Sequence, residues 1–176
     1  MTTEDGRRAK LCTMDATIRA VEAGDWKAVT EVFNHFVTGS LAAYPEEPVA
    51  DDFFEKKCLA APGYPFLVAE SGSVVVGFAY LSPFNPVATM RRSATLTYFI
   101  HPDHTGKGLG SRFLDLLLEA GRKLGVRSFL AHISSANEGS IRFHMRHGFS
   151  ECGRFLKVGV KDGHTFDMVW MQLLEG

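Results

Sequence analysis

The segment that decides how this chain folds is Ile100–Gly110, IHPDHTGKGLG, which lies just past the middle of the sequence. Alternating residues over 94–100 precede it and predict a β-strand, and apolar residues at helical spacing follow it from Leu109. Glycines at positions 106, 108 and 110 allow backbone N–H groups to approach an anion, and the helix N-terminus adds its positive dipole end. The segment therefore predicts a strand–turn–helix unit that binds a phosphate or pyrophosphate.

Three phosphate-binding motifs compete for this turn, and a plain glycine-rich turn without a ligand is a fourth interpretation. A P-loop requires GxxxxGK followed by Ser or Thr, whereas Lys107 is followed by Gly108. The dinucleotide-binding fingerprint requires GxGxxG near the chain start, whereas this turn reads GxGxG. The third motif, (Gln/Arg)-x-x-Gly-x-(Gly/Ala), cradles the pyrophosphate of coenzyme A. Gly108 and Gly110 fit it, and Thr105 stands in its first position.

Outward from this turn, hydrophobic periodicity predicts a mixed domain. We expect strands over 17–21, 66–69, 74–81, 94–100, 127–133, 150–160 and 166–173. The first expected helix is capped by Asp25 and ends at Gly39, and the second opens at Asp51 or Asp52 with Phe54, Cys58 and Leu59 on one side. The third begins at Leu109 and is expected to bury Leu109, Phe113, Leu116, Leu117, Ala120 and Leu124. Asn137 can cap the fourth, and the order as a whole indicates an α/β or α+β domain around one central sheet.

Length and composition indicate one globular domain: the chain has 176 residues, of which 45% are hydrophobic and 22% charged. A net charge of -1 disfavours nucleic-acid binding, and no apolar run approaches the roughly 20 residues of a membrane-spanning helix. Residues 1–16 are expected to form a flexible leader ahead of a domain over 17–176. Three separated cysteines, Cys12, Cys58 and Cys152, are expected to be reduced thiols of a cytoplasmic protein.

Four motifs in a fixed order resemble the GNAT family of N-acetyltransferases: Ile100–Asp103, Gly106–Gly110, Asn137–Ser140 and His144–Phe149. More narrowly, the chain resembles the phosphinothricin and methionine sulfoximine acetyltransferase branch. The further matches to that branch are Ile18-Arg19, Asn34-His35, Glu47-Pro48, Leu67–Glu70, Gly77–Ala79, Pro83-Phe84, Val158-Gly159, Asp167 and Met171-Gln172. The resemblance spans roughly residues 17–173, and it is the ordered set of motifs that makes it specific.

This resemblance implies a single domain with a twisted mixed sheet of about seven strands, flanked by about four helices. The fourth and fifth strands, here 94–100 and 127–133, are expected to splay apart and to hold acetyl-CoA between them. The family acetylates a primary amine directly, without an acyl-enzyme. Such a transfer needs an uncharged amine, a held thioester, stabilisation of the oxyanion and a proton for the leaving thiolate.

The resemblance also assigns the residues that would bind acetyl-CoA. Main-chain N–H groups of the turn and of the first helical turn would bind the pyrophosphate; these residues are Thr105, Gly106, Lys107, Gly108, Leu109, Gly110 and Ser111. Tyr98, Phe99 and Ile100 would run beside the pantetheine arm. Asn137 is either a helix cap or a cofactor ligand, and Ser140 is a lesser candidate.

Catalytic groups are assigned in the same way. His144 occupies a position where this branch often has a histidine that serves the departing thiolate, and an imidazole with a pKa near 6.5 can donate a proton there. Thr95 stands where the branch usually carries a glutamate as general base, and a threonine cannot take up the amine proton. Glu46 and Glu47, in a proline-flanked loop, are the expected substitutes, either directly or through water, and His35 is a third option.

The acceptor is expected to be a small amino-acid analogue with a free amine and a carboxylate. Arg91 is expected to grip the carboxylate, and Asn85 stands where relatives often place a second arginine. Thr95, Thr97 and Phe36 complete the expected acceptor pocket. The alternatives to a small-molecule N-acetyltransferase are a non-catalytic acetyl-CoA-binding module and an enzyme that acetylates a peptide or protein amine. We expect no metal site, and we expect a homodimer by analogy with the branch.

Overall fold

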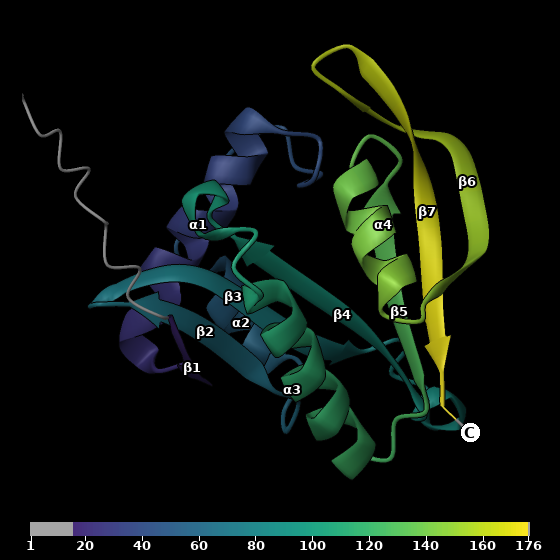
Figure 1. Ribbon diagram of the computed structural model, residues 1–176, viewed down its shortest axis with the longest axis horizontal. Coiled ribbons are helices and arrows are strands. Elements are labelled where there is room, and N and C mark those ends of the chain that lie inside the picture. The colour runs from purple at the N-terminus through teal and green to yellow at the C-terminus, as the bar shows by residue number, and fades with distance from the viewer. Residues whose placement is uncertain (1–15, 176) are drawn as a thin grey trace, which may run out of the picture.

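A computed structural model describes residues 16–175 as a seven-stranded sheet of order β1-β2-β3-β4-β5-β7-β6, flanked by helices (Figure 1). The strands are β1 (Thr17–Ala20), β2 (Phe66–Ser71), β3 (Val74–Pro83), β4 (Ser93–Ile100), β5 (Ser128–Ser134), β6 (Ser150–Lys161) and β7 (His164–Leu174). The α-helices are α1 (Trp26–Gly39), α2 (Phe53–Leu59), α3 (Leu109–Lys123) and α4 (Glu138–Arg146). This architecture confirms the predicted mixed α/β class. The expected leader falls almost wholly outside the described residues, and no described helix is long and apolar enough to cross a membrane.

The feature that creates a site is the separation of β4 from β5. These two strands are the parallel pair of the sheet, and they pair only over Ser93–Thr95 and Ser128–Leu130. Figure 1 shows them diverging toward the end of the sheet where α4 lies. The expected splay is therefore present, and the facing edges of residues 96–100 and 131–134 have no partner strand between them. Backbone N–H and C=O groups on those edges are available to a ligand.

The two faces of the sheet carry two separate hydrophobic clusters because side chains alternate along each strand. On one face α3 covers the sheet, with Phe113, Leu117 and Phe129 fully buried. On the other face α1 and α2 cover it, with Val29, Phe54 and Phe78 fully buried. Alternation along β4 thus sends Tyr98 and Ile100 to the α3 side, and Phe99 to the α1 side.

Two helices bury a different stripe from the one that the sequence predicted. In α3 the expected Leu116 and Leu124 are exposed, and the buried set is Leu109, Phe113, Leu114, Leu117, Leu118 and Gly121. This stripe follows one face of a helix with 3.6 residues per turn, whereas Leu116 and Leu124 fall on its flank. In α2 the expected Leu59 is also exposed, whereas Phe54 is buried and Cys58 packs against the same core cluster.

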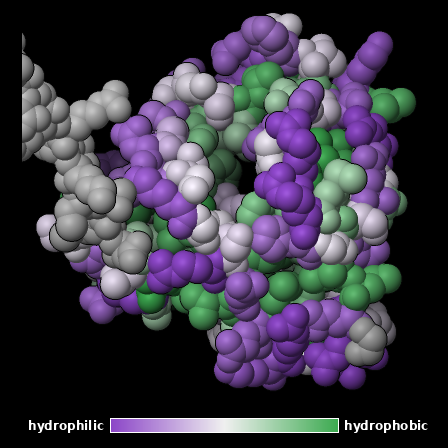
Figure 2. All heavy atoms as spheres, in the orientation of Figure 1, coloured by the Kyte–Doolittle hydropathy of each residue, from purple (hydrophilic) through white to green (hydrophobic). Residues whose placement is uncertain are grey.

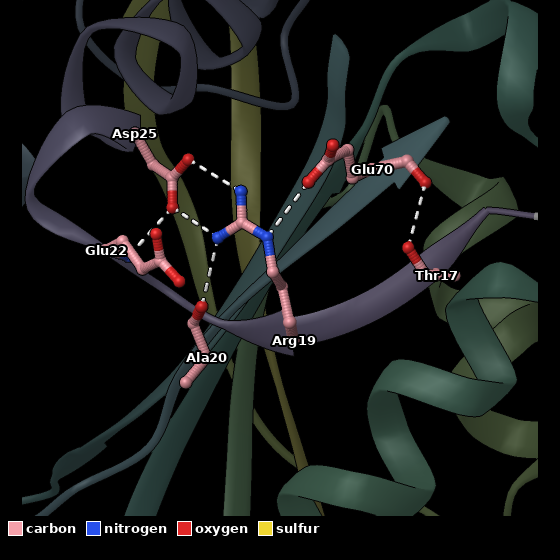
Figure 3. A network of polar contacts seen from close by, with 6 residues as sticks. All are labelled: Thr17, Arg19, Ala20, Glu22, Asp25 and Glu70. Atoms are coloured by element: carbon pink, nitrogen blue, oxygen red, sulfur yellow. Dashed lines mark hydrogen bonds and ion pairs between the residues drawn. The ribbon is translucent and has the colours of Figure 1, made fainter. Parts of the chain in front are cut away.

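An ionic cluster joins β1, β2 and the start of α1 (Figure 3). Nη1 and Nη2 of Arg19 donate to the two carboxylate oxygens of Asp25 at 2.6 and 2.9 Å, and Nε donates to Glu70 at 2.9 Å. Asp25 stands at the N-cap position of α1, but the expected cap is wrong, since its carboxylate makes no hydrogen bond to the helix. It accepts instead from the Glu22 backbone N–H, and the bonds from Arg19 lower the pKa of Asp25.

A buried lysine ties the β6–β7 hairpin to the end of α1. The side chain of Lys161 is 1% exposed, and its Nζ donates to the carbonyl oxygens of Val37, Ser40 and Ala43 at 2.6, 2.9 and 2.8 Å. The ammonium thereby satisfies carbonyl groups at the C-terminus of α1, where the helix dipole favours a positive charge. It also fixes the path of residues 40–45, which form part of the site described next.

Candidate active site

A cavity of about 640 Å³ lies at the splay and is lined by side chains from both faces of the sheet. Figure 2 shows the surface hollowed near the centre of the view. Residues from β3, β4, β5, α1, α2, α4 and the loops after α1, β4 and β5 line it: Phe33, Phe36, Ala42, Ala43, Tyr44, Pro45, Phe53, Phe54, Lys57, Tyr80, Leu96, Thr97, Tyr98, Phe99, Ile100, Thr105, Ala131, His132, Ile133, Ser134, Asn137, Ser140 and His144. No aspartate or glutamate is among these described lining residues.

One wall of the cavity holds a hydrogen-bonded pair, Tyr98 on β4 and His144 on α4. The Tyr98 hydroxyl lies 2.8 Å from Nε2 of His144, and Nδ1 of the same ring lies 2.8 Å from the carbonyl oxygen of Ser140. A carbonyl oxygen can only accept, so Nδ1 carries the imidazole proton and Nε2 accepts from the Tyr98 O–H. The sequence predicted both residues for the site but not the contact between them.

Both members of this pair are neutral at pH 7. His144 is 2% exposed, and burial lowers its pKa to about 4. Burial also raises the pKa of Tyr98, so the phenol keeps its proton. The pKa near 6.5 that was expected for His144 is therefore wrong, and its role as proton donor to the thiolate stays a prediction.

The glycine-rich turn has the geometry of an anion cradle. Gly106 and Gly108 adopt φ of +73° and +78°, and a Cβ on either would project into open space. Gly108 leads directly into α3, whose first N–H groups lack intrahelical partners. At Gly110 an added Cβ would meet the Phe143 ring at 3.4 Å, so this glycine lets α3 approach α4.

Side chains of the turn are mostly committed to local hydrogen bonds. Thr105 donates its hydroxyl proton to Pro102 O at 2.8 Å, and Lys107 donates from Nζ to Asp103 O at 2.9 Å. Ser111 lies 3.0 Å from Nε2 of His147. Of the residues 105–111, Thr105 alone lines the cavity. The backbone of the turn, rather than its side chains, is thus the part free to bind an anion.

Asn137 caps α4, which confirms one of the two interpretations that the sequence left open, and the other stays a prediction. Its Oδ1 accepts from Ser140 N at 3.1 Å and caps α4. The residue also lines the cavity, together with Ser140. Capping uses the amide oxygen, so the Nδ2 protons remain available to a ligand.

The opposite wall contains a second pair that sequence reasoning missed, Tyr44 and His132. The Tyr44 hydroxyl lies 3.2 Å from Nδ1 of His132 on β5, and the two rings stack at a centroid distance of 5.5 Å. Burial lowers the pKa of His132, with a smaller contribution from Lys57, and burial raises the pKa of Tyr44 to about 12. Strand alternation was the signal available: in the predicted strand 127–133, His132 falls on the face opposite Ala131 and Ile133.

The structure brings together only part of the expected acceptor pocket. Thr97 and Phe36 line the cavity. Glu46 and Glu47 are exposed and do not line it, although the preceding Tyr44 and Pro45 do.

Three further expected residues lie outside the cavity. Thr95 is in the paired part of β4, where its hydroxyl lies 2.7 Å from that of Ser82. Asn85 accepts from Val87 N, and the exposed Arg91 donates to Ala88 O, so both are engaged within their own loop. No described group of three His, Cys, Asp or Glu side chains is placed to hold a metal ion.

Comparison with known proteins agrees with this geometry. Residues 26–149 match the model of the acetyltransferase (GNAT) family. A methionine sulfoximine/methionine sulfone acetyltransferase of Salmonella typhimurium is 35% identical over 161 residues, which cover 89% of this chain and 93% of that protein. A phosphinothricin N-acetyltransferase of Alcaligenes faecalis is 30% identical over 166 residues, covering 93% and 84%. The crystal structure of a GNAT superfamily phosphinothricin acetyltransferase from Sinorhizobium meliloti, in complex with acetyl-CoA, superposes with a TM-score of 0.86 at 31% identity, covering 93% and 90%.

Proposed function

Since the chain belongs to the acetyltransferase (GNAT) family, we propose that it transfers the acetyl group of acetyl-CoA directly to the primary amine of a small amino-acid-like substrate. The observation that carries the proposal is the cavity at the splay, which reaches both sheet faces and thus gives two reactants access to one point. Relatives named for methionine sulfoximine, methionine sulfone and phosphinothricin support an amino-acid analogue as acceptor.

The residues present fit coenzyme A. The backbone N–H groups from Gly106 to Ser111 would bind its pyrophosphate, and the unpaired edge of 96–100 would hydrogen-bond its pantetheine arm. The Nδ2 group of Asn137, and Ser140, would hold the arm from the α4 side. When bound, acetyl-CoA supplies an activated acetyl thioester.

Tyr98 is the residue we assign to donate a proton to the leaving thiolate. Tyr98 lines the cavity, and burial raises its pKa, so the phenol is protonated at neutral pH. His144 holds this hydroxyl through Nε2 and is itself held through Nδ1 by the Ser140 carbonyl. His144 is therefore a positioning residue in this assignment, and the proton comes from Tyr98.

A thiol-release assay with acetyl-CoA tests the function. The panel compares methionine sulfone, methionine sulfoximine and phosphinothricin with polyamines and short peptides. Saturable turnover on the amino-acid analogues is expected. Acetyl-CoA binding without turnover on any amine would instead indicate a non-catalytic binding module, and faster acetylation of a peptide would indicate a protein-modifying enzyme.

A homodimer built on the edge strand β6 is a further part of the proposal. β6 ends the sheet, and its apolar side chains Phe155, Leu156, Val158 and Val160 are 55% to 72% exposed. An exposed apolar edge strand needs a partner to avoid aggregation, and a second copy of the chain is the simplest one. Sedimentation should show a dimer that Leu156→Glu converts to monomer, whereas Val74→Glu, at an exposed apolar position on β3, leaves it intact.

A cytoplasmic location is likewise proposed. The described cysteines, Cys58 and Cys152, are free thiols. Free thiols persist in a reducing compartment. Fractionation of cells that produce the tagged protein tests this assignment.

A further inference from the structure

We propose that His132 is the general base that takes the proton from the acceptor amine, and that Tyr44 positions its imidazole. The inference rests on the proposed function and deepens it. Thr95 stands where the resembling branch carries a glutamate, so the base is the group that sequence reasoning left without a firm assignment. Four features of the described residues support His132: its place in the sheet, its hydrogen bond, its charge state and the absence of a carboxylate from the lining.

Strand register places His132 at the mouth of the splay. The last paired residues of β4 and β5 are Thr95 and Leu130. Two residues further along each strand are Thr97 and His132, which alternation keeps on the face covered by α1 and α2. Both line the cavity. His132 thus stands on the acceptor side of the gap, whereas Tyr98 and its partner lie on the side of α3 and α4.

Neighbouring groups fix the imidazole and leave one nitrogen free. Nδ1 lies 3.2 Å from the Tyr44 hydroxyl, and the Trp170 ring packs against the imidazole at a centroid distance of 5.2 Å. The proposal places the proton of the neutral imidazole on Nδ1, from which it donates to the Tyr44 oxygen, so that the lone pair is on Nε2. Within residues 16–175 no hydrogen bond to this Nε2 is formed.

The charge state suits a base. The His132 side chain is exposed, but the residues packed around it remove part of its hydration and lower its pKa below the ordinary value. The imidazole is therefore neutral and able to accept a proton at pH 7. The titratable groups that face it are the Tyr44 phenol from the loop after α1 and the Lys57 ammonium from α2. From β7 it meets the indole of Trp170, and Tyr80 of β3 lines the same cavity.

Competing bases are absent from the described lining. It contains no aspartate or glutamate, and Glu46 and Glu47 are exposed outside it. The other imidazole of the lining, His144, already accepts the Tyr98 proton at Nε2 and donates from Nδ1. His132 is therefore the one lining imidazole with an uncommitted lone pair among the described residues.

In the proposed reaction the acceptor amine loses one proton to His132, and the leaving thiolate gains one from Tyr98. The neutral amine attacks the thioester carbon, the C–N bond forms, and one N–H proton moves to the lone pair of His132 Nε2. The C–S bond breaks, and the thiolate takes up the Tyr98 proton. Imidazolium then returns its proton to water, and the phenolate regains one, so the products are the amide and the free thiol.

Steady-state kinetics of His132→Gln with methionine sulfone provide the main test. A general base contributes typically 100- to 10,000-fold, so kcat/KM should fall by about 100-fold or more. Acetyl-CoA Kd, measured by calorimetry, should stay within about twofold, because His132 is on the acceptor side. In the wild type, kcat/KM should fall as the pH drops below the His132 pKa, which lies under 6.5, and this limb should be missing from the variant. His164→Gln, at an exposed histidine outside the cavity, is the matched control.

Four further measurements separate a base from a structural residue. Added imidazole should restore part of the activity of His132→Gly. It should leave the activity of the control, His164→Gln, unchanged. Tyr44→Phe should lower kcat less than His132→Gln does and shift the acidic limb, and NMR should find the His132 imidazole titrating below pH 6.5. Glu46→Gln combined with Glu47→Gln should retain activity.

The outcomes distinguish the inference from the function beneath it. If the wild type acetylates the amine and His132→Gln matches it, or if imidazole restores nothing, the assignment of His132 is overturned and the N-acetyltransferase stands. Loss of activity in the double variant Glu46→Gln/Glu47→Gln would assign the role of general base to one of these two glutamates instead. A wild type that turns over no amine would overturn both.

Discussion

The hydroxyl oxygen of Tyr98 lies 2.8 Å from Nε2 of His144, and this contact joins β4 to α4 across the cofactor side of the splay. The carbonyl oxygen of Ser140 lies 2.8 Å from Nδ1 of His144 and therefore fixes the imidazole proton on that nitrogen. The two side chains therefore form a neutral, preorganised unit in which the tyrosine carries the only mobile proton.

Removing the Tyr98 hydroxyl should slow the acetyl-transfer step without weakening the binding of acetyl-CoA. Tyr98→Phe is expected to lower kcat by about 100-fold, the scale of a lost general acid, with acetyl-CoA Kd within about twofold. His144→Ala should lower kcat less, because the tyrosine hydroxyl loses its positioning partner but remains present. Stopped-flow thiol release and calorimetry check both variants. A Tyr98→Phe enzyme with unchanged kcat would contradict the assignment, as would one that lost only cofactor affinity.

The depressed pKa of His144 makes stability depend on pH. The folded state holds this imidazole neutral with a pKa of about 4, against 6.5 ordinarily, so the unfolded chain binds its proton first as the pH falls. His144 contributes stability above pH 6.5 that is lost as the pH falls to about 4, and the gap corresponds to roughly 3 kcal/mol. Urea unfolding at several pH values should give a flatter profile for His144→Gln than for the wild type. If the free energy of unfolding changed equally with pH in the wild type and in His144→Gln, the buried neutral imidazole would be refuted. His164→Gln is the control.

The glycine turn offers a matched pair of substitutions. Gly108→Val should abolish measurable acetyl-CoA binding, because a branched side chain is strained at φ of +78° and would stand before the helix N-terminus. Gly125→Val imposes the same strain at φ of +83°, at the far end of α3. It should cost comparable stability and leave binding intact. Calorimetry combined with thermal unfolding separates the two effects, and equal loss of affinity in both variants would show that strain alone is responsible.

Local sequence signals were sufficient for the strands of the sheet, the glycine-rich turn and the starts of α3 and α4. Alternation over 94–100 and the glycines of the turn specify β4 and the start of α3, and both occur where predicted. The N-cap preference of asparagine likewise located α4 at Asn137. These features depend on residues adjacent in the chain, which is why the sequence reveals them.

The acceptor side depends on contacts between distant segments. His132 meets Tyr44 across 88 positions of the chain, and no periodicity records such a pair. The Glu46 and Glu47 assignment followed proximity in sequence to a site loop, but the loop turns Tyr44 inward and leaves both carboxylates in solvent. The stripe of α3 was also misplaced, because which flank of an amphipathic helix is buried is decided by the sheet beneath it.

Lys161 is the clearest case of a long-range determinant. Its Nζ bonds the carbonyl oxygen of Val37, which lies 124 positions earlier in the chain. The hydrogen bonds of this ammonium hold residues 40–45, which line the cavity in part, against the β6–β7 hairpin. Burying an ammonium is costly unless its protons are satisfied, and here three carbonyl oxygens satisfy them. The loop so held carries Tyr44, the proposed partner of His132.

Lys161→Met should therefore affect both stability and the acceptor, but not the cofactor. Loss of the charged hydrogen bonds is expected to cost about 1–3 kcal/mol in free energy of unfolding, measured by denaturant titration. The loosened loop should raise KM for the amine several-fold while acetyl-CoA Kd stays unchanged, because the turn before α3 is untouched. Lys157→Met, at an exposed lysine of the same strand, is the control and should change neither quantity. If Lys161→Met lost stability but kept the wild-type KM for the amine, Lys161 would have a purely structural role. The loop that it holds would then not take part in acceptor binding.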